Sequence, residues 1–150
     1  MLIYLDNCSF NRHFDDQKQI RIKIETDAKL FIQEQIIKGS LKLAWSYMLD
    51  YENSANPFTE KKETIDNWKK YSITDTGETN NILSVAEELF NKRLKSKDAL
   101  HVACAVELNC NFFITTDKTM IKKLVNFKPV KIMSPVDFIN YYTEIKDAHR

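Results

Sequence analysis

The sequence predicts an α/β fold with a central parallel sheet. Short apolar runs at residues 2–5, 41–45 and 112–115 have the length of buried strands, and longer segments with helical spacing separate them. Asp6 follows the first run directly, and Asp117 follows the third. A buried strand has no structural need for an acid at its C-terminal end, whereas ligands bind in the crevice beyond the strand ends of such sheets. These acids are therefore the first indication of function.

The helix after the first strand is expected to be long. Asp15 or Asp16 can cap its start, and Gly39 ends it. Its core-facing positions recur at helical spacing and are Ile20, Ile24, Ala28, Phe31, Ile32, Gln35 and Ile36.

Shorter elements complete the N-terminal half. A second strand is predicted at residues 41–45, and Ser46 can cap the helix that follows it. This helix stops before Pro57, because the residue preceding a proline avoids the α region. The next elements are a charged helix at 58–68, a strand at 71–73 and a break at Gly77.

The C-terminal half continues the alternation of helices and strands. Its predicted elements are helices at 79–94 and 97–108, a strand at 112–115, a helix beginning near Asp117, a strand at 130–133 and a helix at 135–142. Ser134 can cap the last helix, and the tail at 143–150 is expected to fray.

Composition is that of one soluble globular domain spanning residues 1–150. Apolar residues make up 43%, charged residues 29%, and the net charge is +1. No apolar stretch approaches the roughly 20 residues of a membrane span, and the N-terminus does not resemble a signal peptide. We therefore expect a cytoplasmic protein without a membrane partner. Cys8, Cys104 and Cys110 lack metal-site spacing and are expected to be small buried hydrophobes.

Several classes of enzyme are excluded by what the sequence lacks. Gly39 and Gly77 are its only glycines, so neither a dinucleotide-binding fingerprint nor a phosphate-binding P-loop can form. No histidine lies in a nucleophile signature. A dehalogenase-type phosphatase needs Asp-x-Asp after its first strand, and Asp6-Asn7-Cys8 lacks the second acid.

Acids gathered from distant parts of a chain favour metal-dependent phosphoryl chemistry. Mg²⁺ and Mn²⁺ prefer oxygen ligands, and Mg²⁺ is usually held by one or two carboxylates while substrate phosphate and water complete its shell. Besides Asp6 and Asp117, Asp98 opens a predicted helix. Each acid also has a purely structural explanation, since Asp6 and Asp117 can cap turns and Asp98 suits a first helical turn.

The order of these motifs resembles a known family. Leu5-Asp6 after a strand, an acid in the helix after the second strand, Lys97-Asp98-Ala99-Leu100-His101-Val102-Ala103 and Phe113-Ile114-Thr115-Thr116-Asp117 resemble the PIN domain of VapC-type toxin ribonucleases. The resemblance covers residues 2 to about 138. It implies a three-layer α/β/α fold, Mg²⁺ or Mn²⁺, and endonucleolytic hydrolysis of RNA. Many relatives work with a cognate antitoxin and assemble as homodimers.

The second acid of the family has two candidates here. Asp50 and Glu52 point about 200° apart on a helix, so one of them faces the site. Glu52 is favoured, because the family usually places glutamate here and its longer side chain can reach the strand ends. Asp50 remains the alternative.

The sequence thus predicts a metal-dependent endoribonuclease whose four carboxylates are Asp6, Glu52, Asp98 and Asp117. Asp6 and Asp117, on neighbouring strands, are expected to bind the principal ion, while Glu52 and Asp98 bind a second ion or orient the attacking water. Two divalent ions would neutralise a charge of about −4. The alternative is a noncatalytic PIN-like module that binds RNA or protein without a complete metal site.

Polar and basic residues near these acids are candidates for supporting roles. Thr115, Thr116 and Asn7 can hydrogen-bond the carboxylates or a phosphate. The candidates for attracting the RNA backbone are Arg12, Lys95, Lys97 and Lys122. A run of charge is also typical of a merely solvated face. His101 is expected to be a packed, hydrogen-bonded side chain rather than a metal ligand.

Overall fold

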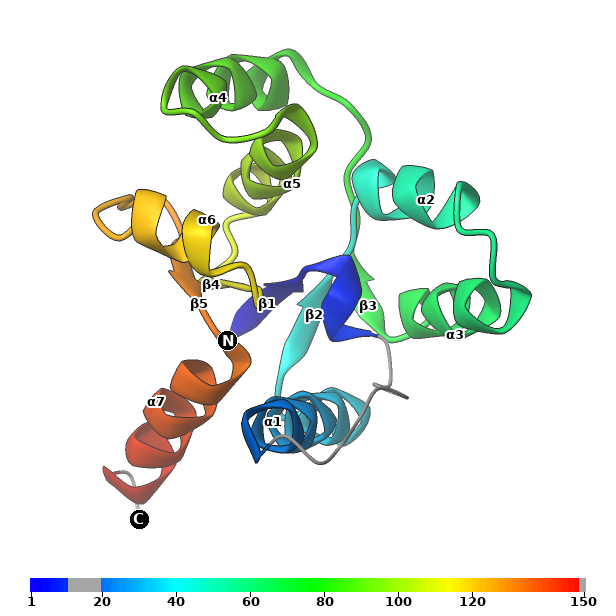
Figure 1. Ribbon diagram of the computed structural model, residues 1–150, viewed down its shortest axis with the longest axis vertical. Coiled ribbons are helices and arrows are strands. Elements are labelled where there is room, and N and C mark those ends of the chain that lie inside the picture. The colour runs from blue at the N-terminus through cyan, green and yellow to red at the C-terminus, as the bar shows by residue number, and fades with distance from the viewer. Residues whose placement is uncertain (11–19, 149–150) are drawn as a thin grey trace.

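A five-stranded, all-parallel sheet forms the centre of the computed structural model, which describes residues 1–10 and 20–148 (Figure 1). The strand order is β3-β2-β1-β4-β5. The strands are β1 (Leu2–Leu5), β2 (Lys42–Ala44), β3 (Ser72–Thr74), β4 (Phe112–Ile114) and β5 (Lys131–Met133). Each predicted strand is confirmed to within a residue or two of its ends.

Helices cover both faces of the sheet and complete the three layers. α1 and α7 pack together on one face, while α2 and the α4–α5 pair lie on the other (Figure 1). The helices are α1 (Ile20–Ile37), α2 (Tyr47–Ser54), α3 (Thr59–Lys69), α4 (Asn80–Asn91), α5 (Ser96–Glu107), α6 (Lys118–Lys123) and α7 (Pro135–Ala148), with a 3₁₀ turn η1 (Asn7–Ser9) after β1. The expected α/β/α fold is confirmed.

The topology brings the ends of β1 and β4 together. The chain adds β2 and β3 on one side of β1, then crosses to add β4 and β5 on the other. Leu5 pairs with Ile114 in parallel register, and the Asp6 amide donates to the Ile114 carbonyl over 3.0 Å. In a doubly wound sheet, such a switch point is where the loops diverge and leave a crevice. The residues after β1 and β4 therefore meet at one edge.

Buried aromatic side chains pack directly beneath this edge. The rings of Tyr4 and Phe113 stack with centroids 5.1 Å apart, and both residues are fully buried. Phe10 packs against Trp45 with ring centroids 5.4 Å apart. Strands covered on both faces are apolar nearly throughout, which is why the tyrosine hydroxyl in β1 is unusual.

The expected apolar face of α1 is only partly buried. Ala28, Ile32 and Ile36 lie in the core, but Ile20 is 77% exposed and Ile24 is 50% exposed. Helical spacing identifies the apolar face of a helix but does not say how much of that face other elements cover. In α1 the buried residues begin at Ala28, and the helix packs against α7. The predicted caps Asp15 and Asp16 lie outside the described residues.

Two helix ends differ from the prediction. α4 ends at Asn91 rather than at residue 94, because Arg93 adopts a left-handed backbone (φ 70°) without a glycine to signal it. α7 continues to Ala148, so residues 143–148 are helical rather than a frayed tail. Tyr142 is buried, and its ring contacts Phe31 on α1 and Phe138. This packing holds the last turns of α7 in place.

The three thiols are free, as expected, but they differ in burial. Cys104 and Cys110 are buried, whereas Cys8 is half-buried and lies 3.4 Å from the Thr116 hydroxyl. Cys8 is therefore not the fully buried hydrophobe that the sequence predicts, because it sits in the polar loop after β1. Among the described helices, none has both the length and the apolarity to cross a membrane.

Candidate active site

Asp6 is fixed in place at the C-terminal end of β1 by hydrogen bonds to both of its oxygens. Oδ1 accepts from the Asn7 amide over 2.7 Å and so caps the 3₁₀ turn. Oδ2 accepts from the Thr115 hydroxyl over 2.8 Å. Asp6 can therefore cap the 3₁₀ turn and still bind a ligand, because each of its carboxylate oxygens retains a further lone pair.

Thr115 connects Asp6 to the loop that carries Asp117. Its side chain is fully buried, and its hydroxyl also accepts from the Asp117 amide over 3.1 Å. Asp117 in turn caps α6, with Oδ1 accepting from the amides of Thr119 (3.0 Å) and Met120 (3.1 Å). One hydroxyl therefore fixes the relative position of two acids from different strands.

Glu52 lies on the other side of the β1 loop. Its Oε2 accepts from the Asn7 side-chain amide over 2.7 Å, and its Oε1 accepts from His101 Nε2 over 2.6 Å. Burial raises the pKa of Glu52, but the hydrogen bond and charge of His101, with the Asn7 hydrogen bond, outweigh it and hold the pKa below its usual value. Glu52 is therefore ionised at neutral pH.

Asp50 faces a different part of the molecule. Its Oδ1 accepts from Trp45 Nε1 over 2.9 Å, and its Oδ2 accepts from the Lys69 ammonium over 3.0 Å. The two acids of α2 thus have separate surroundings. Glu52 adjoins the loop of Asp6, and Asp50 does not.

Behind Glu52, His101 belongs to a buried hydrogen-bonded chain that begins at Ser46. The Tyr4 hydroxyl lies 2.6 Å from both His101 Nδ1 and Ser46 Oγ. Burial, followed by the nearby Cys104 thiol, raises the pKa of Tyr4 well above its usual value, so Tyr4 keeps its proton. Because Glu52 can only accept, His101 carries a hydrogen on Nε2, and the Tyr4 hydroxyl is the partner of Nδ1.

Two residues of this hydrogen-bonded series, Tyr4 and Ser46, support the candidate site and are not identified from the sequence as doing so. Tyr4 was not distinguished from the other residues of its strand, and Ser46 was expected to act only as a helix cap. Ser46 does cap α2, accepting from the Leu49 amide over 3.3 Å. The available signal was a hydroxyl in the middle of an otherwise apolar strand, which must find a buried partner.

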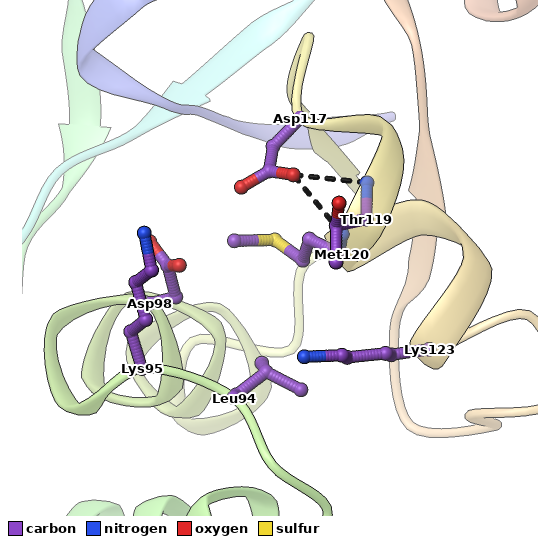
Figure 2. Close-up of a pocket in the computed structure, with 7 residues that line it drawn as sticks. All are labelled: Leu94, Lys95, Asp98, Asp117, Thr119, Met120 and Lys123. Carbon is purple, nitrogen blue, oxygen red and sulfur yellow. Dashed lines mark hydrogen bonds between the residues drawn. The ribbon is translucent and has the colours of Figure 1, made fainter.

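Asp98 completes the acidic region from the first turn of α5. Burial, then the negative charges of Asp6 and Asp117, raise the pKa of Asp98, while His101 and Lys95 act in the opposite direction. Figure 2 shows Asp98 and Asp117 pointing toward each other across a hollow of about 190 Å³. The negative charges of Asp6 and Asp117 therefore disfavour the ionised form of Asp98.

These acids do not form a compact cluster. Within residues 1–10 and 20–148, no three His, Cys, Asp or Glu side chains are grouped so that they could hold a metal ion as they stand. Glu52 is bound by Asn7 and His101, and one oxygen of Asp117 is used in capping α6. The donor set is nevertheless all oxygen, which suits hard divalent cations.

The predicted basic and polar candidates fall in several places. Lys95 lines the hollow between Asp98 and Asp117, together with Lys123, which the sequence does not distinguish from its neighbours. Lys97 lies on the Glu52 side. Lys122 is not one of the described residues that line this hollow. Arg12 lies outside the described residues, and Thr116 contacts Cys8 rather than a carboxylate.

The fold and the site define an α/β protein with a carboxylate-lined crevice at the C-terminal edge of a parallel sheet. The sequence model of the PIN domain matches residues 3–124, and the chain therefore belongs to the PIN domain family. This confirms the family that the sequence motifs resemble. No curated protein matches the sequence.

Two solved structures share the fold. One is VapBC2 from Rickettsia felis bound to a DNA fragment from its promoter, with 15% identity, a TM-score of 0.58, and coverage of 89% of this chain and 98% of that one. The other is VapBC-1 from nontypeable Haemophilus influenzae, with 13% identity, a TM-score of 0.53, and coverage of 90% and 98%. At these identities, the likeness concerns the fold.

Proposed function

We propose that this chain is a VapC-like toxin nuclease, and specifically a Mg²⁺- or Mn²⁺-dependent endoribonuclease that hydrolyses RNA phosphodiester bonds. The observation that carries the proposal is the meeting of Asp6 and Asp117, at the ends of β1 and β4, with Asp98 at the start of α5, where burial and then the charges of Asp6 and Asp117 raise the pKa of Asp98. Membership of the PIN family and the fold shared with VapBC proteins support it. Acids that share one edge of a sheet and raise one another's pKa are candidates for a cation site.

The acidic residues have distinct roles in this proposal. Asp6 and Asp117 would hold the principal ion, and Asp98 and Glu52 would bind a second ion or orient the attacking water. Bound divalent ions lower the pKa of water and neutralise charge on the phosphate. Of the two orienting acids, Asp98 has the raised pKa and is the better proton acceptor, whereas Glu52 is held ionised by its hydrogen bonds.

The surrounding residues would position both the acids and the substrate. Thr115 and Asn7 hold Asp6 and Glu52, respectively, through the hydrogen bonds described above. Lys95 would guide the RNA backbone into the acidic region, whose own charge would otherwise repel it. No protein nucleophile is required.

A cognate antitoxin is the proposed protein partner, since the two solved structures compared above are VapBC proteins. A homodimer and a cytoplasmic location complete the proposal. Co-expression with the neighbouring gene, followed by size-exclusion chromatography with light scattering, tests both the partner and the oligomeric state.

RNA cleavage with and without metal is the direct test. Purified protein should cleave RNA with Mn²⁺ or Mg²⁺ and stop when a chelator is added. Asp6→Asn keeps the shape but removes the charge, so cleavage should fall at least about a hundredfold while the fold is retained. Glu52→Gln should lower cleavage, and the matched change Asp50→Asn on the same helix should not. Near-normal cleavage by Asp6→Asn would contradict the proposal.

A noncatalytic RNA- or protein-binding module is the second candidate. It is favoured by the finding that the described acids are not grouped as a ready metal cluster. In that case binding would be insensitive to chelator, no RNA would be cleaved, and millimolar Mn²⁺ would leave the melting temperature unchanged. A metal site should instead raise the melting temperature, because bound ion adds about 2.7 kcal/mol to the free energy of unfolding at a hundredfold excess over Kd.

A further inference from the structure

A second hollow, of about 550 Å³, lies on the Glu52 side of the site. It is within the ~300–1,000 Å³ range of ligand sites. Its lining includes Asn7, Tyr51, Glu52, Phe58, Lys61 and Lys97. We propose that this hollow, here called the stacking groove, binds unpaired RNA nucleotides next to the cleaved bond. The inference rests on the proposed function and names the form of its substrate.

Two exposed aromatic rings distinguish the stacking groove. Tyr51 and Phe58 are each 59% exposed, although large aromatic side chains usually bury most of their surface. Phe58 also occupies the N-cap of α3, where the side-chain oxygen of Ser, Thr, Asp or Asn usually accepts a hydrogen bond from a backbone amide, and Phe58 makes no such bond. Neither ring is explained by the packing of the fold. Both offer a face on which a base can stack.

Each ring is accompanied by a lysine. The Lys61 ammonium lies 4.8 Å from the centroid of Phe58, and the Lys97 ammonium lies 5.9 Å from the centroid of Tyr51. A positively charged surface with interleaved aromatic rings is the common arrangement for single-stranded nucleic acid, because the cations follow the phosphates while the rings stack the bases. The stacking groove has both components.

The stacking groove joins the acidic site directly. Glu52 lines it, and Lys97 precedes Asp98 at the start of α5. Asn7 also lines it, and the buried Asn7 Oδ1 accepts no hydrogen bond from any described residue. A strand entering the acidic site can therefore continue along the groove.

Single-stranded RNA fits these features better than a duplex or a protein. Bases within a duplex are already stacked on one another and do not reach an aromatic side chain. Protein interfaces are depleted in lysine, whereas here a lysine stands over each ring. The stacking groove therefore suits unpaired nucleotides better than an RNA duplex or a protein partner.

Binding measured without metal tests this inference. Anisotropy of a labelled ten-nucleotide single strand, recorded with the full chain in chelator, should give about tenfold weaker affinity for Tyr51→Ala and for Phe58→Ala. Tyr51→Phe keeps the ring and should bind normally. Phe90→Ala is the matched control, because Phe90 is 57% exposed on α4, away from the groove. A 2-aminopurine base in the strand should lose fluorescence on binding to wild type and not to the alanine variants.

The possible outcomes separate the groove from the proposed function. Unchanged affinity of both alanine variants would overturn the inference, as would an equal loss for duplex RNA. Normal RNA binding combined with lost binding of a purified antitoxin would assign the surface to protein instead. If the rings govern binding but Mn²⁺ gives no cleavage, the nuclease assignment fails and the groove stands. If the variants cleave with unchanged KM, the groove fails and the nuclease stands.

Discussion

The His101 ring donates from Nε2 to Glu52 Oε1 over 2.6 Å and is only 2% exposed, so a buried imidazole directly holds an acid of the candidate site. The Tyr4 hydroxyl lies 2.6 Å from the other ring nitrogen. Tyr4 on β1 and Glu52 on α2 thus share one partner on α5. Besides Asn7, the orientation of Glu52 therefore depends on His101 and Tyr4, which line neither hollow.

The first prediction is that Tyr4 and Glu52 are energetically coupled although no contact joins them. In a double-mutant cycle of Tyr4→Phe and Glu52→Gln, urea unfolding should give a coupling energy of about 0.5–1 kcal/mol. Tyr4→Phe alone should cost about 1–3 kcal/mol, because it leaves a buried ring nitrogen unpaired. Additive effects of the two changes would mean that His101 does not transmit the constraint.

The second prediction concerns the stability of the metal-free protein. Because the pKa of Asp98 is raised in the folded state, its ionised carboxylate lowers the free energy of unfolding above that pKa. Asp98→Asn should therefore raise the melting temperature in chelator at pH 7.5, by about 2–4 °C for each kcal/mol gained. As the pH falls through the raised pKa, wild-type Asp98 becomes protonated and the difference should shrink, and it should vanish below the pKa of the unfolded chain.

Glu52 provides the control of opposite sign for this experiment. Its pKa is lowered by folding, so its contribution to stability is present above its unfolded pKa and is lost as the pH falls through the folded value. Glu52→Gln should accordingly lower the melting temperature at pH 7.5. If Asp98→Asn and Glu52→Gln shift the melting temperature in the same direction, folding does not move the pKa values of these two acids in opposite directions.

A third prediction assigns a positioning role to Thr115. Thr115→Val removes the hydroxyl that donates to Asp6 and accepts from the Asp117 amide, so metal-dependent cleavage should fall about 10–100-fold. Thr116→Val is the matched control, since the Thr116 hydroxyl contacts Cys8 instead. The melting temperature and the apparent Mn²⁺ affinity should be measured for both. Equal activity of the two variants would contradict the role.

The fourth prediction separates the lysines of the basic run. Lys95 lines the acidic hollow, so Lys95→Ala should reduce the slope of log K against log salt for single-stranded RNA by about 0.7. Lys122→Ala on α6 should change the slope less. Nitrocellulose filter binding in chelator at several salt concentrations measures both slopes. An unchanged slope for Lys95→Ala would show that Lys95 belongs to a solvated face.

Local signals made most of the fold predictable from the sequence. Strands buried on both faces appear in the sequence as short apolar runs. Ser46 marks the start of a helix through its capping hydrogen bond, and Gly39 follows the end of a helix with a left-handed backbone. The same holds for Asp6, Asp98 and Asp117, which occupy the ends of recognisable elements. The missed helix ends lacked such signals. Arg93 is left-handed without being glycine, and α7 is extended by contacts with a distant helix.

The sequence by itself therefore determined the order of the strands and helices along the chain and predicted three acids at the ends of these elements, since both depend on patterns a few residues long. The sequence favoured Glu52 over Asp50, but only the tertiary structure gave the two acids their different partners, because the direction a helix faces is set by what packs against it. It alone joined Tyr4 to Ser46 and His101, which lie 42 and 97 positions away in the chain. Buried polar groups must find partners, but the sequence does not say which, because those partners are brought together by the packing of the whole domain.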